Sequence, residues 1–322
     1  MNQCPNCGIM NMDENKFCGE CGFKLSSPKN YCPICDKTYS SREKFCTQCG
    51  KKLTTKLEHD IIQNDPVLMK INQEFNEMNT TTSSIYDLEG HEVIIILKDG
   101  TNLTNWDDVT DKSEVIYIIE DISKYTDLRW KYEHFESLKS IKTLGSTNQL
   151  TNISLLFKGC YSLVDISSLV NWDVSNITEM GEMFALCLSL TNLHALKEWD
   201  VSNVKEMNRM FSNCMSLNDI SPLANWVVSN VEDMIRMFYN CMSLNDISPL
   251  ANWDVSNVKF TTWMFSRCNS INDISPLENW DVSNVEGADR MFRGCNSIKD
   301  FSPIDNWPNH LKEKIMRDFD NL

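Results

Sequence analysis

Two amino acids return at a fixed interval through the second half of the chain. Cysteine and tryptophan each recur every 27 residues, six times over. The cysteines are Cys160, Cys187, Cys214, Cys241, Cys268 and Cys295. The tryptophans are Trp172, Trp199, Trp226, Trp253, Trp280 and Trp307. A fixed period of this length predicts a solenoid, in which each unit buries its apolar side against its neighbours.

The pattern of residues within each copy of the repeat predicts a short strand followed by a helix. In the third copy the apolar residues of the second half are Val231, Met234, Met237, Phe238 and Cys241. Their spacing is typical of one face of a helix, and Ser229 and Asn230 stand where side-chain oxygens can cap its first N–H groups. Residues 216–223, which contain Pro222, predict an extended segment and a turn. The predicted fold class is therefore an α/β solenoid, with a short strand, a tryptophan-bearing corner and a helix in each repeat.

The repeat also resembles a known family. The fourth copy and its neighbours follow the pattern SLNDISPLANWDVSNV, then MxxMFxxC, and this pattern is similar to the BspA-type leucine-rich repeats of bacterial surface proteins. The resemblance covers at least residues 138–321. It implies a leucine-rich-repeat-like solenoid that serves adhesion or protein binding, with no catalytic residue in the motif.

The segments around the repeats predict caps and a linker. Glu92–Lys98, an Asp99-Gly100 turn and Glu114–Ile122 favour strands that close the first coil. We expect four regions: a double zinc ribbon at 1–54, a helical linker at 55–84, an N-terminal cap with a degenerate first repeat at 85–159, and six repeats at 160–322. The last of these six is a C-terminal cap.

Eight further cysteines form two copies of one small unit. They are Cys4, Cys7, Cys18, Cys21, Cys32, Cys35, Cys46 and Cys49. Each quartet reads C-x2-C-x10-C-x2-C, and the second follows the first after 28 residues. Neither copy has enough apolar residues for a core, so a metal or disulfides must hold it together. Paired C-x2-C turns at this spacing favour two structural zinc ions, each held by four thiolates. Disulfides are the alternative, and the ligands of the two sites could also interleave.

This segment resembles the double zinc-ribbon modules that are fused to many bacterial and archaeal proteins. The resemblance implies that the eight cysteines are metal ligands. It does not imply one function, since such ribbons serve as adaptors, nucleic-acid contacts or structural caps.

Charge and motifs exclude several classes of function. Forty-five acidic against 30 basic residues give a net charge of −15, which argues against a general nucleic-acid binder. No apolar run is long enough for a membrane helix, and no secretory signal is recognisable, so we expect a cytoplasmic protein, with the cell surface by a non-classical route as the alternative. The five histidines are scattered, and no phosphate loop, HExxH or GxSxG motif occurs, so we do not expect an enzyme.

Stacked repeats turn each position into a column. We expect the cysteine column to be buried free thiols and the tryptophan column to be core, with a carbohydrate platform as the alternative for tryptophan. One acidic column is Asp173, Asp200, Asp254 and Asp281, and another is Asp165, Asp219, Asp246, Asp273 and Asp300. We expect these carboxylates to accept backbone hydrogen bonds at turns, with calcium binding as the less favoured alternative.

The fourth copy departs from the pattern. Phe260 and Trp263 stand where earlier copies have mainly charged residues. An aromatic pair flanked by Arg236, Arg267 and Arg290 has the composition of an interaction hot spot. These five residues are the candidate partner-binding residues, although a rotated helix or a covering neighbour would also explain them.

Together these features favour a non-enzymatic adaptor, in which a zinc-ribbon module is tethered to a solenoid that binds a protein partner. The alternative is a nucleic-acid or transcription-associated factor directed by the ribbons. A weaker alternative is a surface adhesin.

Replacing one ribbon cysteine tests the zinc assignment and the independence of the two halves. Cys18→Ser should unfold one ribbon and release about one zinc ion per chain, because a tetrahedral site loses one of its ligands. The melting transition of the solenoid should stay unchanged. Metal analysis and thermal melting measure both, and loss of structure throughout the chain would show that the halves are not independent.

Overall fold

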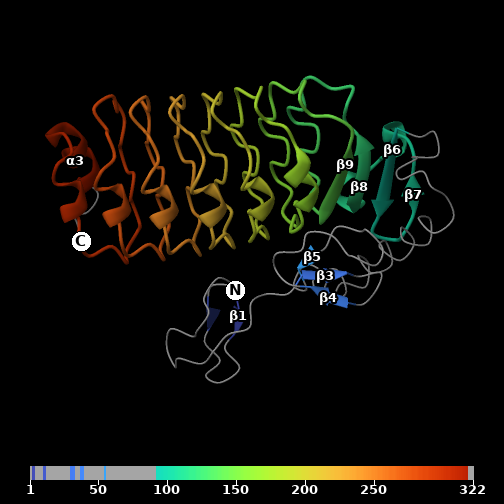
Figure 1. Cartoon of the computed structure of the whole chain (residues 1–322), viewed down its shortest axis with the longest axis horizontal. Helices are drawn as coiled ribbons and strands as arrows, with labels where there is room; N and C mark the ends of the chain where they lie inside the picture. The colour runs from blue at the N-terminus through green and yellow to red at the C-terminus, as the bar shows by residue number, and fades with distance from the viewer. Residues whose placement is uncertain are drawn as a thin grey trace. The chain divides into compact units, whose positions relative to one another are not determined.

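A computed structural model describes residues 92–317 and five short strands nearer the N-terminus. The chain divides into two compact units, Met1–Tyr86 and Asp87–Leu322 (Figure 1). The helix predicted within residues 55–84 and the side chains of the eight paired cysteines lie outside the described residues.

The described strands of the first unit form one hairpin in each copy of its repeat. β1 (Asn2–Gln3) pairs antiparallel with β2 (Met10–Asn11). In the second copy β3 (Asn30–Cys32) pairs antiparallel with β4 (Lys37–Tyr39) and with β5 (Thr54–Thr55). In the first copy Cys4 and Cys7 lie between the two strands in the sequence, and in the second copy β3 ends at Cys32.

The second unit begins with a four-stranded sheet. Its strands are β6 (Val93–Leu97), β7 (Asn102–Leu103), β8 (Val115–Asp121) and β9 (Ser140–Leu144), in the spatial order β7-β6-β8-β9. β6 is antiparallel to both of its neighbours, whereas β8 and β9 are parallel. The parallel pairing continues from Ser140 of β9 to Asp165 in the next coil. The strands predicted around 92–98 and 114–122 are confirmed, and they close the first coil.

A buried glutamate organises the polar interior of this cap. Glu120, in β8, is 1% exposed. It accepts hydrogen bonds from the hydroxyls of Tyr132 at 2.7 Å and Tyr125 at 2.9 Å, and from the indole N–H of Trp106 at 3.2 Å. The ammonium group of Lys131 lies 3.0 Å from the same carboxylate. A buried charge is tolerated only when it is paired and hydrogen-bonded in this way, so the cluster has a structural role.

The helix predicted in each repeat is wrong. Residues 231–241 form a run of tight turns, in which the N–H of Met237 donates to the carbonyl of Met234 at 3.1 Å. The N–H groups of the residues immediately before and after Met237 donate instead to carbonyls of the following coil. That of Arg236, for example, donates to the carbonyl of Thr262 at 3.0 Å. Left-handed backbone at Arg236 and Asn240 also interrupts any helix. Successive three-residue turns return a side chain to the interior about as often as a helix does, so the apolar spacing does not distinguish the two.

The coils are joined through this same segment. Parallel bridges connect one residue of each coil to the next, in the series Asn152, Glu179, Glu206, Asp233, Phe260 and Gly287. We call the turn segments that carry these bridges the ladder. The ladder is the strand-like part of each coil, although the sequence predicted a helix there.

The half of each repeat that was predicted to be extended instead contains a 3-10 helix. These helices are Ser167–Asn171, His194–Leu196, Ser221–Leu223, Ser248–Leu250, Ser275–Leu277 and Ser302–Ile304. In four of them proline stands in the first turn, where its missing N–H costs nothing. The stack ends at α3 (Asn309–Met316), which buries Leu311 and Ile315 (Figure 1).

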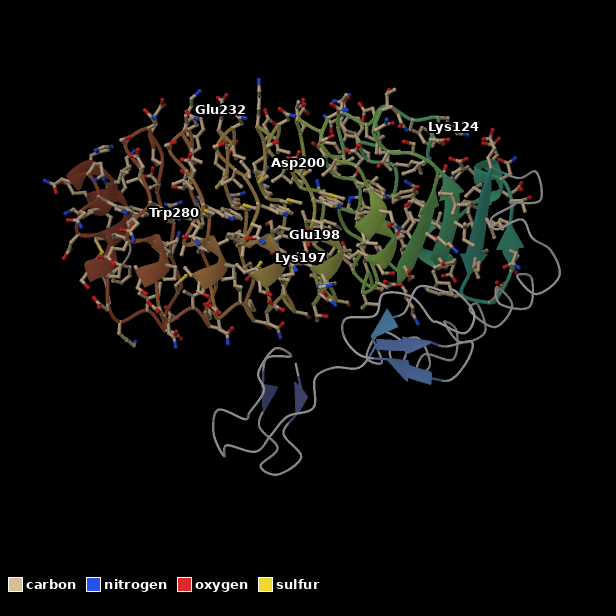
Figure 2. All side chains as sticks on the ribbon, viewed as in Figure 1. Lys124, Lys197, Glu198, Asp200, Glu232 and Trp280 are labelled. Atoms are coloured by element: carbon tan, nitrogen blue, oxygen red, sulfur yellow. The ribbon has the colours of Figure 1, made fainter. Side chains whose placement is uncertain are left out.

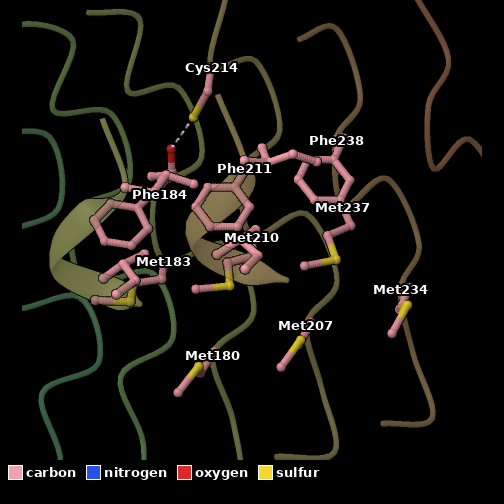
Figure 3. Packing of buried hydrophobic residues seen from close by; sticks show 14 of the residues in the cluster. Met180, Met183, Phe184, Met207, Met210, Phe211, Cys214, Met234, Met237 and Phe238 are labelled. Atoms are coloured by element: carbon pink, nitrogen blue, oxygen red, sulfur yellow. Dashed lines mark hydrogen bonds between the residues drawn. The ribbon is translucent and has the colours of Figure 1, made fainter. Parts of the chain in front are cut away.

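The interior consists of columns of identical side chains. Six phenylalanines from Phe157 to Phe292 stack with neighbouring ring centroids 5.6–5.8 Å apart. Each cysteine of the repeat is buried and free, and Cys214 donates its Sγ–H to the carbonyl of Phe184 in the preceding coil at 3.1 Å (Figure 3). Burial raises the pKa of Cys214 to about 12, which makes the thiol unreactive.

The other predicted columns also find structural partners. The tryptophans are buried, and the indole N–H of Trp226 donates to the carbonyl of Leu196 at 3.0 Å. The column is therefore core and not a carbohydrate platform. Every member of the two aspartate columns accepts a backbone N–H two residues on, as Asp219 does from Ser221 at 2.9 Å. These turn hydrogen bonds account for the carboxylates.

A charge placed in the methionine column should destabilise the solenoid. Met237 is fully buried, so Met237→Asp should lower the free energy of unfolding by several kcal/mol, because it leaves an unpaired carboxylate in the stack. Met242 is 41% exposed, and Met242→Asp is the matched control, with an expected effect within about 0.5 kcal/mol. Denaturant unfolding measures both. A wild-type-like curve for the Met237 variant would contradict the core assignment.

Candidate functional site

The ladder brings the predicted aromatic pair and its arginines together on one surface. Trp263 is half-buried, and Phe260 is 37% exposed. The guanidinium carbons of Arg290 and Arg236 lie 4.8 and 5.4 Å from the centre of the Trp263 ring. These two arginines occupy the repeat position of Trp263 in the following and the preceding coil. They therefore flank the indole from both sides along the solenoid axis.

Two residues of this surface were not among the predicted ones. Arg293 lies 5.6 Å from the Trp263 ring, and Tyr239 meets that ring edge-on with centroids 6.0 Å apart. Arg236 and Arg267 lie 5.6 and 5.9 Å from the Tyr239 ring. Both missed residues share one repeat position, which carries Ala185, Ser212 and Ser266 in the other three copies between residues 185 and 293. This departure from the pattern was the available signal.

We call these residues the arginine–aromatic patch. Its members are Arg236, Tyr239, Phe260, Trp263, Arg267, Arg290 and Arg293.

The backbone under the patch is costly for large side chains. Arg236, Trp263, Arg267 and Arg290 all have φ between 56° and 65°, in the left-handed region. This conformation costs a non-glycine residue roughly 1–2 kcal/mol. Gly294 fills the position of Arg267 in the following coil, so the fold accepts glycine there. The same conformation recurs at the equivalent positions of other coils, as at Glu182 and Arg209, so it belongs to the repeat and does not by itself distinguish the patch.

The patch arginines lack acidic partners among residues 92–317. In an earlier coil Arg209 pairs with Glu182 at 3.0 Å. None of the four patch arginines forms such an ion pair with a carboxylate of the described segment. In addition, Nε of Arg236 is buried without a hydrogen-bond partner there. The patch thus gathers uncompensated positive charge in a chain whose net charge is −15.

A glycine leaves one side of Phe260 open. Phe260 and Gly287 are partners in the ladder. A Cβ on Gly287 would lie 3.4 Å from Cδ1 of Phe260 and 3.0 Å from Oγ1 of Thr262. Because glycine has no side chain, nothing at this ladder position covers the ring from the following coil. Phe260 therefore adds accessible apolar surface to the patch.

The same ladder position is acidic in the three coils before Phe260. Glu179, Glu206 and Asp233 follow one another as bridge partners, and we call them the acidic column. Burial, and then the charges of Glu179 and Asp233, raise the pKa of Glu206. Burial also raises the pKa of Asp233, against the opposing effect of the Ile235 N–H that it accepts. The ladder thus changes from acidic to aromatic and basic along its length.

The sequence of this solenoid matches one family over most of its length. Residues 126–246 and 218–321 match the family model described as "Mycoplasma protein of unknown function, DUF285". Together the two matches span residues 126–321, more than half of the 322-residue chain. The chain belongs to the DUF285 family. Residues 4–50 match the double zinc ribbon model and include all eight paired cysteines. The resemblances to BspA-type repeats and to double zinc ribbons are thereby confirmed.

One solved structure resembles this DUF285 chain. It is a leucine-rich repeat protein from Bacteroides ovatus ATCC 8483, with 12% sequence identity and a TM-score of 0.30 over 68% of this chain and 70% of the other. No curated protein matches the DUF285 chain. In the part of the chain that the structure describes, no helix is long and apolar enough to cross a membrane.

The chemistry of the N-terminal cysteines fits zinc in this DUF285 protein. In the sequence, Cys4 and Cys7 lie between β1 and β2, and Cys32 ends β3 three residues before Cys35. Pairs with this C-x2-C spacing place two thiolates on one turn. Four thiolates from two pairs are a tetrahedral donor set that zinc prefers. When bound, the metal supplies folding free energy that so small a unit cannot obtain from a core.

The acidic column of the DUF285 ladder predicts a pH-dependent stability. The pKa of Glu206 is raised above its ordinary value of 4.5, so its charged form opposes folding, and this penalty disappears as the pH falls through the raised pKa. Glu206→Gln should therefore raise the melting temperature slightly at pH 7 and have no effect at pH 4.

Glu232 provides the matched control for this experiment. Glu232 lies at the margin of the solenoid (Figure 2), and its ion pair with Lys259 at 2.6 Å lowers its pKa. Glu232→Gln should have no effect or lower the melting temperature at pH 7. A Glu206→Gln protein that melts below the wild type at pH 7 would contradict the repulsion in the acidic column.

Proposed function

We propose that this protein is a non-enzymatic adaptor, whose solenoid binds an acidic segment of a protein partner through the arginine–aromatic patch. The observation that carries the proposal is the group of four arginines around Trp263 and Tyr239, without a carboxylate partner in residues 92–317. Tryptophan, tyrosine and arginine are the residues most enriched in interaction hot spots. An acidic segment would complete the ion pairs that the patch lacks.

The architecture supports this proposal because it holds the patch rigid. The side chains stand on coils that are fixed by the backbone ladder and by the buried phenylalanine stack. Stacking of the guanidinium groups on Trp263 and Tyr239 limits their freedom before a partner arrives. Pre-organised side chains lose less entropy on binding, which favours affinity.

The zinc ribbons would be the second module of the adaptor. We infer two zinc ions, one for each cysteine quartet, and a reducing compartment such as the cytoplasm. The free buried thiols of the repeat and the metal-type spacing of the other eight cysteines support this location, because disulfides are favoured in oxidising compartments. Ribbons that direct the protein to nucleic acid are the alternative.

Crosslinking of the full-length protein in its own cells, followed by mass spectrometry, tests the adaptor function. Trp263→Ala and Arg290→Glu should lose the partners that the wild type captures, since removing a hot-spot residue costs about 2 kcal/mol or more, roughly thirtyfold in affinity. Lys197→Glu is the control, because Lys197 is exposed and its ion pair within residues 92–317 is with its neighbour Glu198 (Figure 2).

The outcomes separate the alternatives. Protein partners that survive nuclease treatment and depend on Trp263 support the adaptor. Partners that are lost after nuclease treatment would favour the alternative, in which the ribbons direct the protein to nucleic acid. Partners that need residues 1–53 and are indifferent to the patch would contradict a binding role for the solenoid.

A further inference from the structure

Three guanidinium groups converge on a single ring in the patch. Those of Arg290, Arg236 and Arg293 lie 4.8, 5.4 and 5.6 Å from the Trp263 centroid. Arg236 comes from the coil before Trp263, whereas Arg290 and Arg293 both come from the coil after it. An anion bound on that second side of the ring would therefore lie beside two arginines.

Arg236 also holds a donor that lacks an acceptor. Its Nε is buried and has no hydrogen-bond partner in the described segment. A buried donor without an acceptor costs free energy, so native structures rarely keep one. Because Nε is buried, an anion at the surface would reach it only if the side chain turned outward, and the acceptor gained would favour that movement.

The charge of the site favours a phosphate over a carboxylate. A carboxylate brings one negative charge and two oxygens, which one arginine fork satisfies. A phosphorylated side chain brings nearly two negative charges and three acceptor oxygens. Arginine clusters that lack carboxylate partners suit such a group, and they are a recurring means of phosphopeptide recognition.

The surroundings favour one phosphate over a polyanion. Along the ladder, the acidic column of Glu179, Glu206 and Asp233 leads directly to Phe260. A nucleic-acid strand that followed the ladder would meet these carboxylates and be repelled. A protein segment with a single phosphate would avoid them, and its neighbouring apolar residues would find the open side of Phe260 at Gly287.

We propose that the arginine–aromatic patch recognises one phosphorylated side chain on a segment of a partner protein. The inference rests on the proposed function, in which this patch is the partner-binding surface. It adds that the partner binds in its phosphorylated form, so that a kinase and a phosphatase would control assembly.

Fluorescence anisotropy with the full-length protein tests this directly. The probes are a labelled degenerate peptide pool with central phosphoserine or phosphotyrosine, twin pools with unmodified residues or glutamate at that place, and a single-stranded oligouridine. The phosphorylated pools should bind about tenfold or more tightly than the glutamate pool. Inorganic phosphate should compete with them.

Two variants and one control identify the arginines responsible. Arg290→Gln and Arg236→Lys should each weaken binding of the phosphorylated pools by about tenfold, the latter because lysine keeps the charge but loses Nε and the fork. Arg209→Gln is the control, since Arg209 occupies the same repeat position but is already paired with Glu182. Thermal melting confirms that each variant folds.

Every outcome decides the proposal. Equal binding of the glutamate and phosphorylated pools would overturn phosphate recognition and leave the adaptor function intact. The same conclusion would follow if no pool bound while the crosslinked partners still depended on Trp263. If oligouridine bound more tightly than the phosphorylated pools, both phosphate recognition and the adaptor function would be overturned. Loss of binding in Arg209→Gln as great as in Arg290→Gln would overturn the assignment to the patch.

Discussion

The solenoid depends on backbone hydrogen bonds that alternate between two directions. In the ladder, every second N–H group donates within its own coil and closes a tight turn, while the groups between donate to the next coil. Met234, Arg236, Phe238 and Asn240 make the latter bonds, to carbonyls 26 residues further on, at 2.8–3.0 Å. Because each coil is held to the next at four successive points, their register is fixed. A slip by one residue would break all four bonds and misalign every column.

This register explains why the core is uniform and the outer surface is not. A phenylalanine or cysteine in the core must pack against its own copy in the neighbouring coils, so a change in one coil disturbs two others. Outward positions have no such constraint. The ladder position that carries the acidic column becomes Phe260 and then Gly287 without any change in backbone pairing. Function in a repeat protein of this kind is therefore found where outward columns depart from their pattern.

The sequence predicted much of this fold, for a definable reason. The period, the core columns, the cap strands and the exceptional pair Phe260 and Trp263 all follow from residue type and spacing along the chain. The helix did not form, because turns of three residues return side chains to the interior with nearly the spacing of a helix. Their difference lies in backbone angles and in the choice of acceptor, which depend on the neighbouring coil. Tyr239 and Arg293 were missed although their shared repeat position departs from its pattern of small residues. The partners of Glu120 come from three separate segments of the cap, which no local pattern predicts.

The coil spacing itself determines the chemistry of the patch. Phenylalanines in successive coils are 5.6–5.8 Å apart, and this distance is close to the separation at which a guanidinium group interacts with an aromatic face. A tryptophan in an outward column of arginines is therefore flanked on both sides without any special geometry, as Trp263 is by Arg236 and Arg290. Where arginines follow each other directly, as Arg209 and Arg236 do, like charges lie one coil apart, and Glu182 compensates the first of them. Trp263 occupies the next position of this series, between Arg236 and Arg290. Its ring separates their positive charges and interacts with both guanidinium groups. The repeat thus builds a cluster of positive charge that its own backbone spacing keeps stable, and that only an anion from outside the described solenoid would neutralise.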